Sequence, residues 1–543
     1  MANFAENPII NITRSRFKKR FRVLTTFNAG RIIPIKVMEV LPGQTSNINI
    51  TSVIRMTTPI KPVMDNCWCD LMAFFVPNRI IYDGWEEVQG ANKSGPWKPS
   101  VEKTVPQVTA PEGGWNPGTI ADYMGIPTKT ANLSVSCLPG RAYAQIINDW
   151  FRDENLQNYC YINKGDSNTA GSNGNNRVTD VVGMGQPVKC CKPHDYFTSA
   201  LPEPQKGPDV LLPLGEKTPV YSGADLIPAS NIITQEPMKF LKADGSKPTG
   251  GLMYLDPTSE LVKSGTGDTS AKEKVYPKNL WADLSQATAS TVNQLRLAFQ
   301  LQKMFEKDAR GGTRYTEILL NHFGVQSPDA RLQRSEYLGG KKIPITMAQV
   351  VQTSSTDSTS PQGNTAAFSY TFDKTHICTK SFTEHGLIIV LAMVRTTHTY
   401  QQGLAKMWSR KTRTNFYMPI FANIGEQPIL NKEIYAQGTE VDDNVFGYQE
   451  AWAEYRYEPN QVTGQFRSNA ATSGGLDIWH YADDYSALPT LSNDWIEETE
   501  KNVDRTLAVQ STDADQFIAD FGFDNDEVLP MPIHSIPGLI DHH

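Results

Sequence analysis

The chain has 543 residues, of which 39% are hydrophobic and 20% are charged, and its formal net charge is −7 at pH 7. This composition indicates a soluble protein with a sizeable core, and the length exceeds one average domain, although elaborated β folds often form one long unit. The longest apolar run, Gly386 to Val394, is too short to cross a bilayer, and no apolar h-region follows the first basic residues. We therefore expect neither a membrane span nor a secretory signal, and synthesis in a cytoplasm.

The first distinctive segment is basic. Six cations lie between residues 14 and 22, and together with Glu6 they give residues 1–22 a net charge of +5, which leaves −12 on the rest of the chain. A basic, aromatic-bearing segment on an acidic body predicts an arm over residues 1–30 that binds nucleic acid, with Phe17 and Phe21 available to stack on unpaired bases. A solubilising tail or a docking segment is the alternative. The candidate DNA-binding residues are Arg14, Arg16, Phe17, Lys18, Lys19, Arg20 and Arg22.

Strand patterns begin directly after this segment. Residues 31–40 are rich in Ile and Val, a turn at Pro42-Gly43 follows, and residues 48–56 alternate apolar side chains on one face. The stretch CWCDLMAFFVP, Cys67 to Pro77, is mostly apolar on both faces. Such a pattern is typical of a strand that lies between two layers. We predict a central core strand here.

Cys67 and Cys69 also raise the question of a metal site, with CCKPH (Cys190, Cys191 and His194) as the second half. Structural zinc sites use paired knuckles of the form C-x₂₋₄-C, and neither C-x-C nor C-C has that spacing. The chain has seven cysteines, an odd number without regular spacing, which argues against a disulfide framework. We expect buried free thiols, no metal and no cofactor.

The middle of the chain changes in composition. An amphipathic helix is predicted over residues 139–153, and a second over about 292–310 that ends at Gly311-Gly312. Residues 215–278 have no lasting periodicity, and a second polar tract covers 352–365. Loops of this length are normally functional or disordered. We expect a β fold whose connecting loops have grown to the size of domains.

Further strand patterns follow in the second half of the chain. They are short and β-branched or aromatic, and they cover residues 342–350, 366–372, 386–394 and 449–457. Because strands lie towards both ends of the chain with few helices among them, the sequence predicts an antiparallel sandwich or barrel.

No catalytic constellation accompanies these elements. DFG at Asp520 to Gly522 lacks the other kinase motifs, and ARGGTRY lacks the Lys-Ser/Thr of a phosphate-binding loop. The acidic runs VDDNVFG and DFGFDNDEV lack EF-hand spacing, so we expect solvated loops rather than calcium sites. Structural roles are expected for His322, His385 and His480. We expect a protein that is not an enzyme.

Long ordered blocks across nearly the whole chain resemble the major capsid proteins of microviruses, in the gokushovirus branch. Two departures from the family pattern are Ser335, where Pro is usual, and Asn415, where a carboxylate is usual. The blocks that carry the resemblance include TTFNAGRIIPIKVMEVLPGQT, LPGRAYAQIINDWFRDENLQ, LRLAFQLQKMFEKDARGGTRYTEILLNHFGVQSPDARLQRSEYLGG, YRYEPNQVTGQFRS and MPIHSIPGLIDHH.

The resemblance implies an eight-stranded antiparallel viral jelly roll over residues 31–543, in a protein that self-assembles into a T=1 icosahedral shell around circular single-stranded DNA. It implies insertions at about 78–340 and 398–447, and an extended C-terminal segment over 480–543. The polar stretch 215–278 would form threefold protrusions that contact a host receptor. A small basic DNA-packaging protein and a DNA pilot protein are further implied partners, and the virion, made in bacterial cytoplasm, is the implied location.

Without the resemblance, the residues leave a rival reading open. A carbohydrate-binding β-sandwich would carry Trp and Tyr on its loops, and a glycosidase on the same scaffold would need two carboxylates. Either would exist as a monomer or small oligomer that binds glycan, whereas a capsid protein would sediment as a DNA-containing particle.

Overall fold

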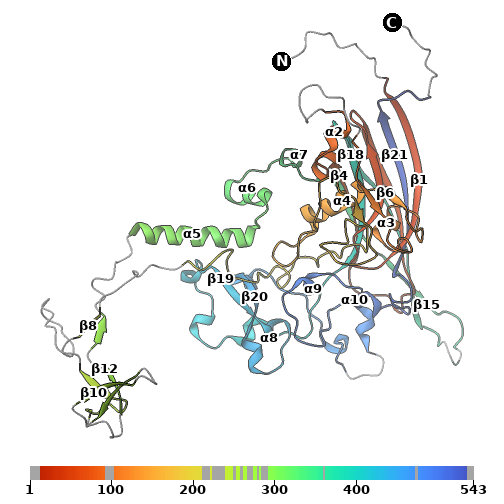
Figure 1. Ribbon diagram of the computed structural model, residues 1–543. Helices are drawn as coiled ribbons and strands as arrows, with labels where there is room; N and C mark the ends of the chain where they lie inside the picture. Colours follow the sequence, from red (N-terminus) through yellow and green to blue (C-terminus); the bar gives the residue numbers. More distant parts are fainter. Residues whose placement is uncertain are drawn as a thin grey trace. The chain divides into compact units, whose positions relative to one another are not determined.

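Figure 1 shows the computed structural model of the chain. It describes residues 13–91, 103–210, 220–222, 239–248, 252–256, 261–265, 273–277, 280–282, 292–356, 358, 361–470 and 475–534. The chain divides into two compact units. The first comprises Met1–Pro204 and Asp308–His543, and the second is Gln205–Lys307.

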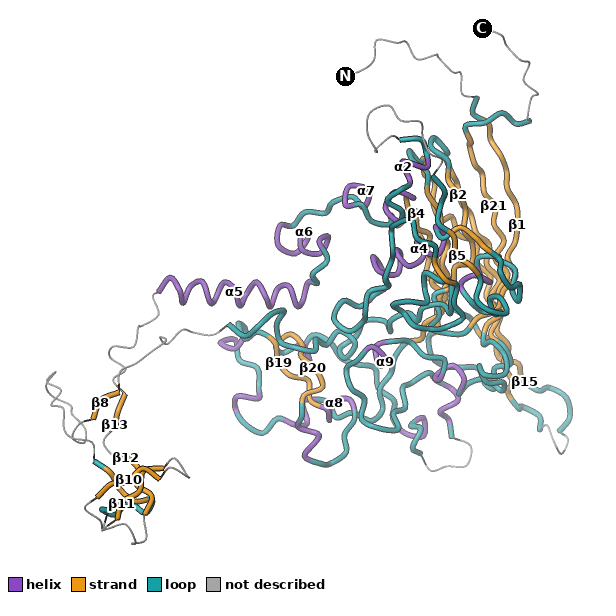
Figure 2. The backbone as a smooth tube through the Cα atoms, in the orientation of Figure 1, coloured by secondary structure: helices purple, strands orange, loops and turns teal. Residues whose placement is uncertain are grey.

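Two four-stranded antiparallel sheets form the centre of the first unit (Figures 1 and 2). In spatial order, the first sheet consists of β1 (Ser15–Phe27), β21 (Phe517–Leu529), β3 (Thr45–Met56) and β17 (Thr371–Ser381). The second consists of β14 (Glu336–Pro344), β4 (Cys67–Pro77), β18 (Gly386–Thr396) and β2 (Ile33–Val40).

The main core lies between these two sheets, because alternate side chains of both point into it. Ile50 of β3, Phe521 of β21 and Val390 of β18 are all buried in one apolar cluster. The sheets therefore form a sandwich, as the alternating patterns predicted.

Strand β4 is a central strand, as its two apolar faces indicated. It pairs with β14 on one side and β18 on the other. Leu71 and Ala73 belong to the core between the sheets, whereas Phe74 and Val76 belong to a second buried cluster. That second cluster includes most of helix α4 (Leu138–Ile146), which contacts both β4 and β18.

Short elements fill the loops of the first unit. The α-helices are α1 (Asn78–Ile81), α2 (Trp85–Val88), α3 (Ile120–Tyr123), α6 (Tyr315–Phe323), α7 (Asp329–Leu332), α8 (Asn431–Ile434), α9 (Asn493–Ile496) and α10 (Lys501–Asp504), and α4 continues into a π-helical turn, η1 (Ile147–Phe151). The 3₁₀ turns are η3 (Lys406–Ser409), η4 (Arg413–Asn415), η5 (Pro419–Phe421), η6 (Glu440–Asp443), η7 (Ala453–Tyr455), η8 (Gly464–Phe466) and η9 (Leu476–Trp479). The smaller sheets are β5 (Gln107–Thr109) with β6 (Ser134–Ser136) and β7 (Thr169–Ala170), β15 (Met347–Val351) with β16 (Thr365–Ser369), and β19 (Glu426–Leu430) with β20 (Val445–Glu450).

The second unit contains the whole polar stretch 215–278, and the described parts of this stretch include β-strands. One sheet is formed by β10 (Leu252–Asp256), β11 (Leu261–Gly265), β12 (Glu273–Pro277) and β9 (Phe240–Lys242), and a separate pair by β13 (Leu280–Ala282) and β8 (Val220–Ser222). The remaining residues of 215–278 lie outside the described ranges. Helix α5 (Val292–Gly311) covers the predicted helix and spans the boundary of the unit.

Three expectations from the sequence need correction. The basic segment is not an arm beside the fold, because residues 15–27 pair along their whole length with β21. The acidic run Asp520–Val528 is not a solvated loop, because it forms most of β21, between β1 and β3. The strand predicted over 449–457 ends at Glu450, because Trp452 adopts a left-handed conformation (φ 64°) and a 3₁₀ turn follows.

The C-terminal segment, predicted as extended over 480–543, is only partly so. Its described part contains α9, α10 and the central strand β21, while residues 535–543 lie outside the described ranges.

Candidate functional site

Strand β1 carries six of the seven predicted DNA-binding residues along an edge of the first sheet, and Arg14 directly precedes it. Because side chains alternate in a strand, Arg16, Lys18, Arg20 and Arg22 all point away from the core and are exposed. The side chains of Arg16, Arg20 and Arg22 are 61%, 71% and 72% exposed. The sheet therefore aligns four of the six cations on one solvent-facing row.

The neighbouring strand offsets much of this positive charge. Arg16 pairs with Asp526 at 2.5 Å and Arg20 with Asp524 at 3.1 Å, and Arg22 lies 3.5 Å from Asp520. The hydrogen bond from Arg16 lowers the pKa of Asp526. Sequence reasoning missed this pairing because the partners lie about five hundred residues apart, at positions that only the register of β1 on β21 brings together.

Two cations of the run differ from the others. Lys19, whose side chain is 50% exposed, pairs at 2.6 Å with Glu527, whose side chain is only 5% exposed. Lys18 is exposed and lies within 4 Å of no carboxylate among the described residues. Lys19 is thus tied to the fold, whereas Lys18 faces solvent.

Of the two aromatic rings predicted to stack on DNA bases, Phe21 is already engaged within the fold. Phe21 stacks on Phe523 with 4.8 Å between ring centroids, and the Lys36 ammonium lies 4.9 Å from the Phe21 ring. Phe17 lies on the same inward face and is half-buried. Phe21 packs against the core between the sheets, so it has little surface left for a base.

The thiols of the CWC motif are core side chains. Cys67 and Cys69 are both buried between the sheets, and burial raises the pKa of both thiols. Asp70 in the same motif forms an ion pair with Arg395 of β18. Within the described ranges, no group of three or more His, Cys, Asp or Glu side chains is arranged to hold a metal ion.

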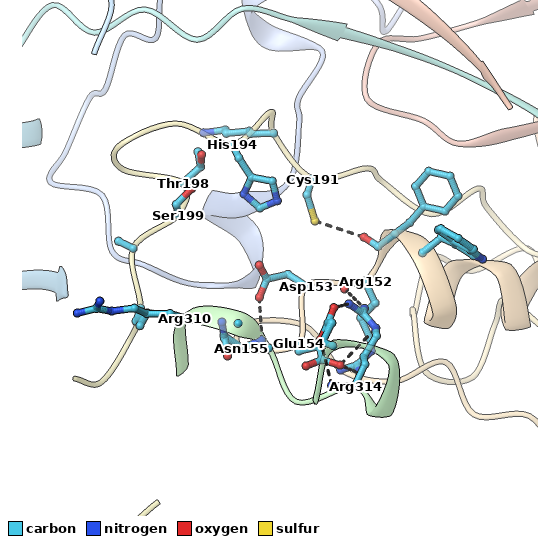
Figure 3. Close-up of a pocket in the computed structure, with 18 of the residues that line it drawn as sticks. Arg152, Asp153, Glu154, Asn155, Cys191, His194, Thr198, Ser199, Arg310 and Arg314 are labelled. Carbon is cyan, nitrogen blue, oxygen red and sulfur yellow. Dashed lines mark hydrogen bonds and ion pairs between the residues drawn. The ribbon is translucent and has the colours of Figure 1, made fainter. Parts of the chain in front are cut away.

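Cys190 and Cys191 differ in exposure. Cys190 is buried and Cys191 is half-buried, and both line a cavity of about 440 Å³, where the Cys191 Sγ donates to the Gln157 amide oxygen at 3.3 Å. Burial raises the pKa of Cys191 to about 11. His194 also lines this cavity (Figure 3).

The charges of this cavity neutralise one another. Arg314 pairs with Glu154 at 3.3 Å and with Glu317 at 3.0 Å, and Figure 3 shows the side chains of Arg152, Glu154 and Arg314 gathered together. Arg310 on another side forms an ion pair with Glu426. These ion pairs hold the loops together at their junction.

The histidines noted in the sequence each have a partner. His322 bonds Asp308 at 2.6 Å, and His480 bonds the carbonyl of Phe466 at 2.7 Å. The ring of His385 meets Trp85 edge-on at 5.6 Å. These contacts agree with the structural roles expected of them.

The acidic run 441–447 is also satisfied within the fold. Asp442 accepts hydrogen bonds from the backbone N–H groups of Gln437 and Gly438, and Asp443 pairs with Lys432 at 2.6 Å. These carboxylates hold a loop together.

The most heavily charged buried cluster surrounds His398, which sequence reasoning missed. Its Nδ1 lies 2.9 Å from Asp483 and its Nε2 lies 3.0 Å from Glu498, and all three side chains are buried. Asn502 donates a further hydrogen bond to Asp483 at 2.6 Å. Burial alone would lower the pKa of His398, but the two carboxylates outweigh it and raise it to about 10.

The two residues that depart from the family pattern both form local hydrogen bonds. Ser335 is fully buried, and its hydroxyl and backbone N–H both donate to Asp149, at 2.7 and 2.9 Å. Asn415 accepts from the backbone N–H and the hydroxyl of Thr412, at 2.9 and 2.7 Å. Each residue is integrated into its own turn.

Comparison with known proteins identifies the family. Residues 5–539 match the model of a phage capsid protein family, described as capsid protein (F protein). The chain belongs to this family. This capsid protein is 45% identical over 535 residues to capsid protein VP1 of Spiroplasma virus 4, covering 97% of this chain and 96% of that protein. It is 43% identical to capsid protein VP1 of Bdellovibrio phage phiMH2K and 40% identical to that of Chlamydia phage 1, with 97% of each covered.

These relatives confirm the resemblance to gokushovirus major capsid proteins and do not favour a glycan-binding protein. The chain is a major capsid protein, with a structural role in the virion, where a capsid protein self-assembles into a shell. Among the helices that the structure describes, none combines the length and apolar character needed to span a bilayer.

Proposed function

We propose that this capsid protein forms a T=1 icosahedral shell around circular single-stranded DNA, built on an eight-stranded viral jelly roll. The observation that carries the fold proposal is the strand order. Read along the chain, the eight long strands alternate between the sheets except at β4 and β14, which are neighbours in the second sheet, and the first strand, β1, pairs with the last, β21. This alternation of strands between two packed sheets is the pattern of a jelly roll.

The outward row of β1 faces the particle interior in this proposal, where Arg16, Lys18, Arg20 and Arg22 meet DNA phosphates or a small basic packaging protein. Their pairing with three aspartates of β21 reduces the positive charge that the sequence indicated. DNA must therefore compete with Asp520, Asp524 and Asp526 for the same guanidinium groups. Binding that rests on phosphate contacts is non-specific and weakens as salt rises.

Two variants that change the charge in opposite directions test the role of this row in DNA packaging. Changing Lys18, Arg20 and Arg22 to Ala should lower the DNA content of purified particles, measured as the ratio of absorbance at 260 and 280 nm. Changing Asp524 to Asn should leave DNA content unchanged or raise it, because it frees Arg20. Lys19 is left intact in both variants, since its loss would leave the buried Glu527 unpaired. Normal DNA content in the triple variant would contradict the proposal.

The second unit, Gln205–Lys307, forms the outward protrusion at the threefold axes and contacts the host receptor in this proposal. Its support is its organisation as a separate compact unit, within which strands β8 and β13 pair. Ser222 of β8 and Leu280 of β13 are register partners, so residues 223–279 can be replaced by a short Gly-Asn turn without stretching the chain.

That replacement should spare shell assembly and reduce adsorption of particles to host cells. A matched control replaces 353–363, the loop between β15 and β16, which also joins paired strands. Unchanged adsorption of the first variant would remove the receptor role from this unit. A packaging protein and a pilot protein complete the proposed partners.

A further inference from the structure

One stretch of the first unit, residues 402–428, lies entirely at the surface of the subunit. It contains no buried residue, although it is rich in large apolar side chains. Trp408 is 70% exposed and Ile420 is 81% exposed. Contiguous apolar surface of this kind on a folded protein marks an interaction site.

This stretch is nevertheless anchored along one side. Tyr417 packs edge-on against Trp452 at 5.5 Å, and the Trp452 indole donates to the carbonyl of Phe421 at 3.2 Å. Arg410 pairs with Glu454 at 3.0 Å and lies over the ring of Tyr455 at 4.5 Å. The exposed side chains are therefore presented from a fixed position.

The exposed rings border a recess. A cavity of about 430 Å³ is lined by Met407 and Trp408 from this stretch and by Tyr455 and Tyr457 from the adjacent turn. Trp, Tyr and Arg are the residue types that dominate binding energy in protein interfaces. We call residues 402–428 with Tyr455 and Tyr457 the aromatic face.

The charge of the aromatic face indicates the partner. Residues 402–428 hold Lys406, Arg410, Lys411 and Arg413 and one carboxylate, Glu426, a net charge of +3. Since the whole chain carries −7, the rest of it sums to −10. Another copy of the chain is thus an acidic partner for this basic and apolar surface.

We propose that the aromatic face is a contact between subunits, covered in the shell by an acidic and apolar surface of a second copy. The inference rests on the proposed function, since a closed shell brings many copies into fixed contact. Such a contact joins two different surfaces, so each subunit offers its aromatic face to one neighbour and its acidic surface to another.

The test compares shell assembly in three purified full-length variants with wild type, by sedimentation and negative-stain microscopy. Trp408→Ser with Ile420→Ser should lower the yield of shells by about tenfold or more, because two anchors are lost. Arg413→Glu should weaken assembly most at low salt, because a reversed charge opposes an acidic partner. Met64→Ser is the control, since Met64 is a comparably exposed apolar residue (76%) away from the aromatic face, and it should assemble as wild type.

Circular dichroism of the unassembled subunits checks that each variant folds. If the double variant does not fold, Arg413→Glu still tests the inference, because it changes only a solvent-exposed side chain. Normal shell yield in both variants would overturn the inference. Normal shells that contain less DNA would indicate that the aromatic face binds nucleic acid. Normal shells that adsorb poorly would indicate that it contacts the host. Either result would also overturn the inference of a contact between subunits. Failure of wild type to form shells would instead contradict the proposed function.

Discussion

A buried cluster of charged side chains around His398 lies at the junction of strand β18 with the C-terminal loops. His398 lies just after β18 and bonds Asp483 and Glu498, which come from chain segments about a hundred residues later. Lys192, at 4.0 Å from Asp483, adds a second positive charge. A charged imidazole between two buried carboxylates holds these segments together and explains how the long insertion before β21 is fixed to the sandwich.

Replacing His398 by Gln should lower the free energy of unfolding of the subunit by about 3–5 kcal/mol, because it leaves two buried carboxylates without their cation. Chemical denaturation of the unassembled subunit measures this. His376→Gln is the matched control, since His376 is an exposed histidine with two uncharged side-chain partners, Asn49 at 3.0 Å and Thr379 at 3.4 Å, and it should change stability by less than about 0.5 kcal/mol. Equal effects of the two substitutions would show that the cluster adds no stability.

The same cluster predicts a dependence on pH. The pKa of His398 is raised from 6.5 to about 10, so its contribution to stability is complete below about pH 6.5 and is lost as the pH rises through about 10. The difference in unfolding free energy between wild type and His398→Gln should therefore narrow between pH 7 and pH 10. A difference that stays constant over this range would contradict a charged His398.

Among the elements, the two sheets differ in how readily their strands could be recognised from sequence. Strands β4 and β18 were predicted because both their faces are apolar, which follows from their position between two buried clusters. Strands β1 and β21 were missed because charge on their outward faces resembles an arm and an acidic loop. The inward alternation of Phe517, Ala519, Phe521 and Phe523 is the signal that could have revealed β21.

The position of β21 as a central strand of the first sheet predicts the effect of a core substitution in it. Phe521 is fully buried between the sheets, so Phe521→Ala should destabilise the subunit by about 3–5 kcal/mol. Asp524→Ala on the outward face of the same strand should cost less than about 1 kcal/mol, because its pair with Arg20 is exposed. Thermal unfolding of both variants tests this, and a mild effect of Phe521→Ala would argue against a central β21.

The contacts of strand β1 predict that its adjacent lysines, Lys18 and Lys19, contribute differently to the stability of the subunit. Lys19→Ala should lower the unfolding free energy by about 1–3 kcal/mol, because it leaves the carboxylate of Glu527 buried without its partner. Lys18→Ala should stay within about 0.5 kcal/mol of wild type, because the Lys18 side chain faces solvent. Similar stabilities of the two variants would contradict the pairing of Lys19 with the buried Glu527.

At the scale of the whole molecule, a two-sheet sandwich carries long connecting loops and a second compact unit. The sequence alone indicated the sandwich, the family and the presence of large insertions. It could not reveal the pairing of β1 with β21 or the partners of His398, because both depend on segments brought together only by the fold. The exposed side chains of residues 402–428 likewise look like ordinary core residues in the sequence, and their exposure emerges only in the folded subunit.

Electron cryomicroscopy of particles assembled from the full-length protein tests the central claim most directly. The account predicts a closed T=1 shell in which the sheet β1-β21-β3-β17 faces the DNA, the second unit projects outward at the threefold axes, and Trp408 is covered by a neighbouring subunit. A soluble monomer under assembly conditions, or a shell whose interior is lined by the second unit and not by β1, would contradict it.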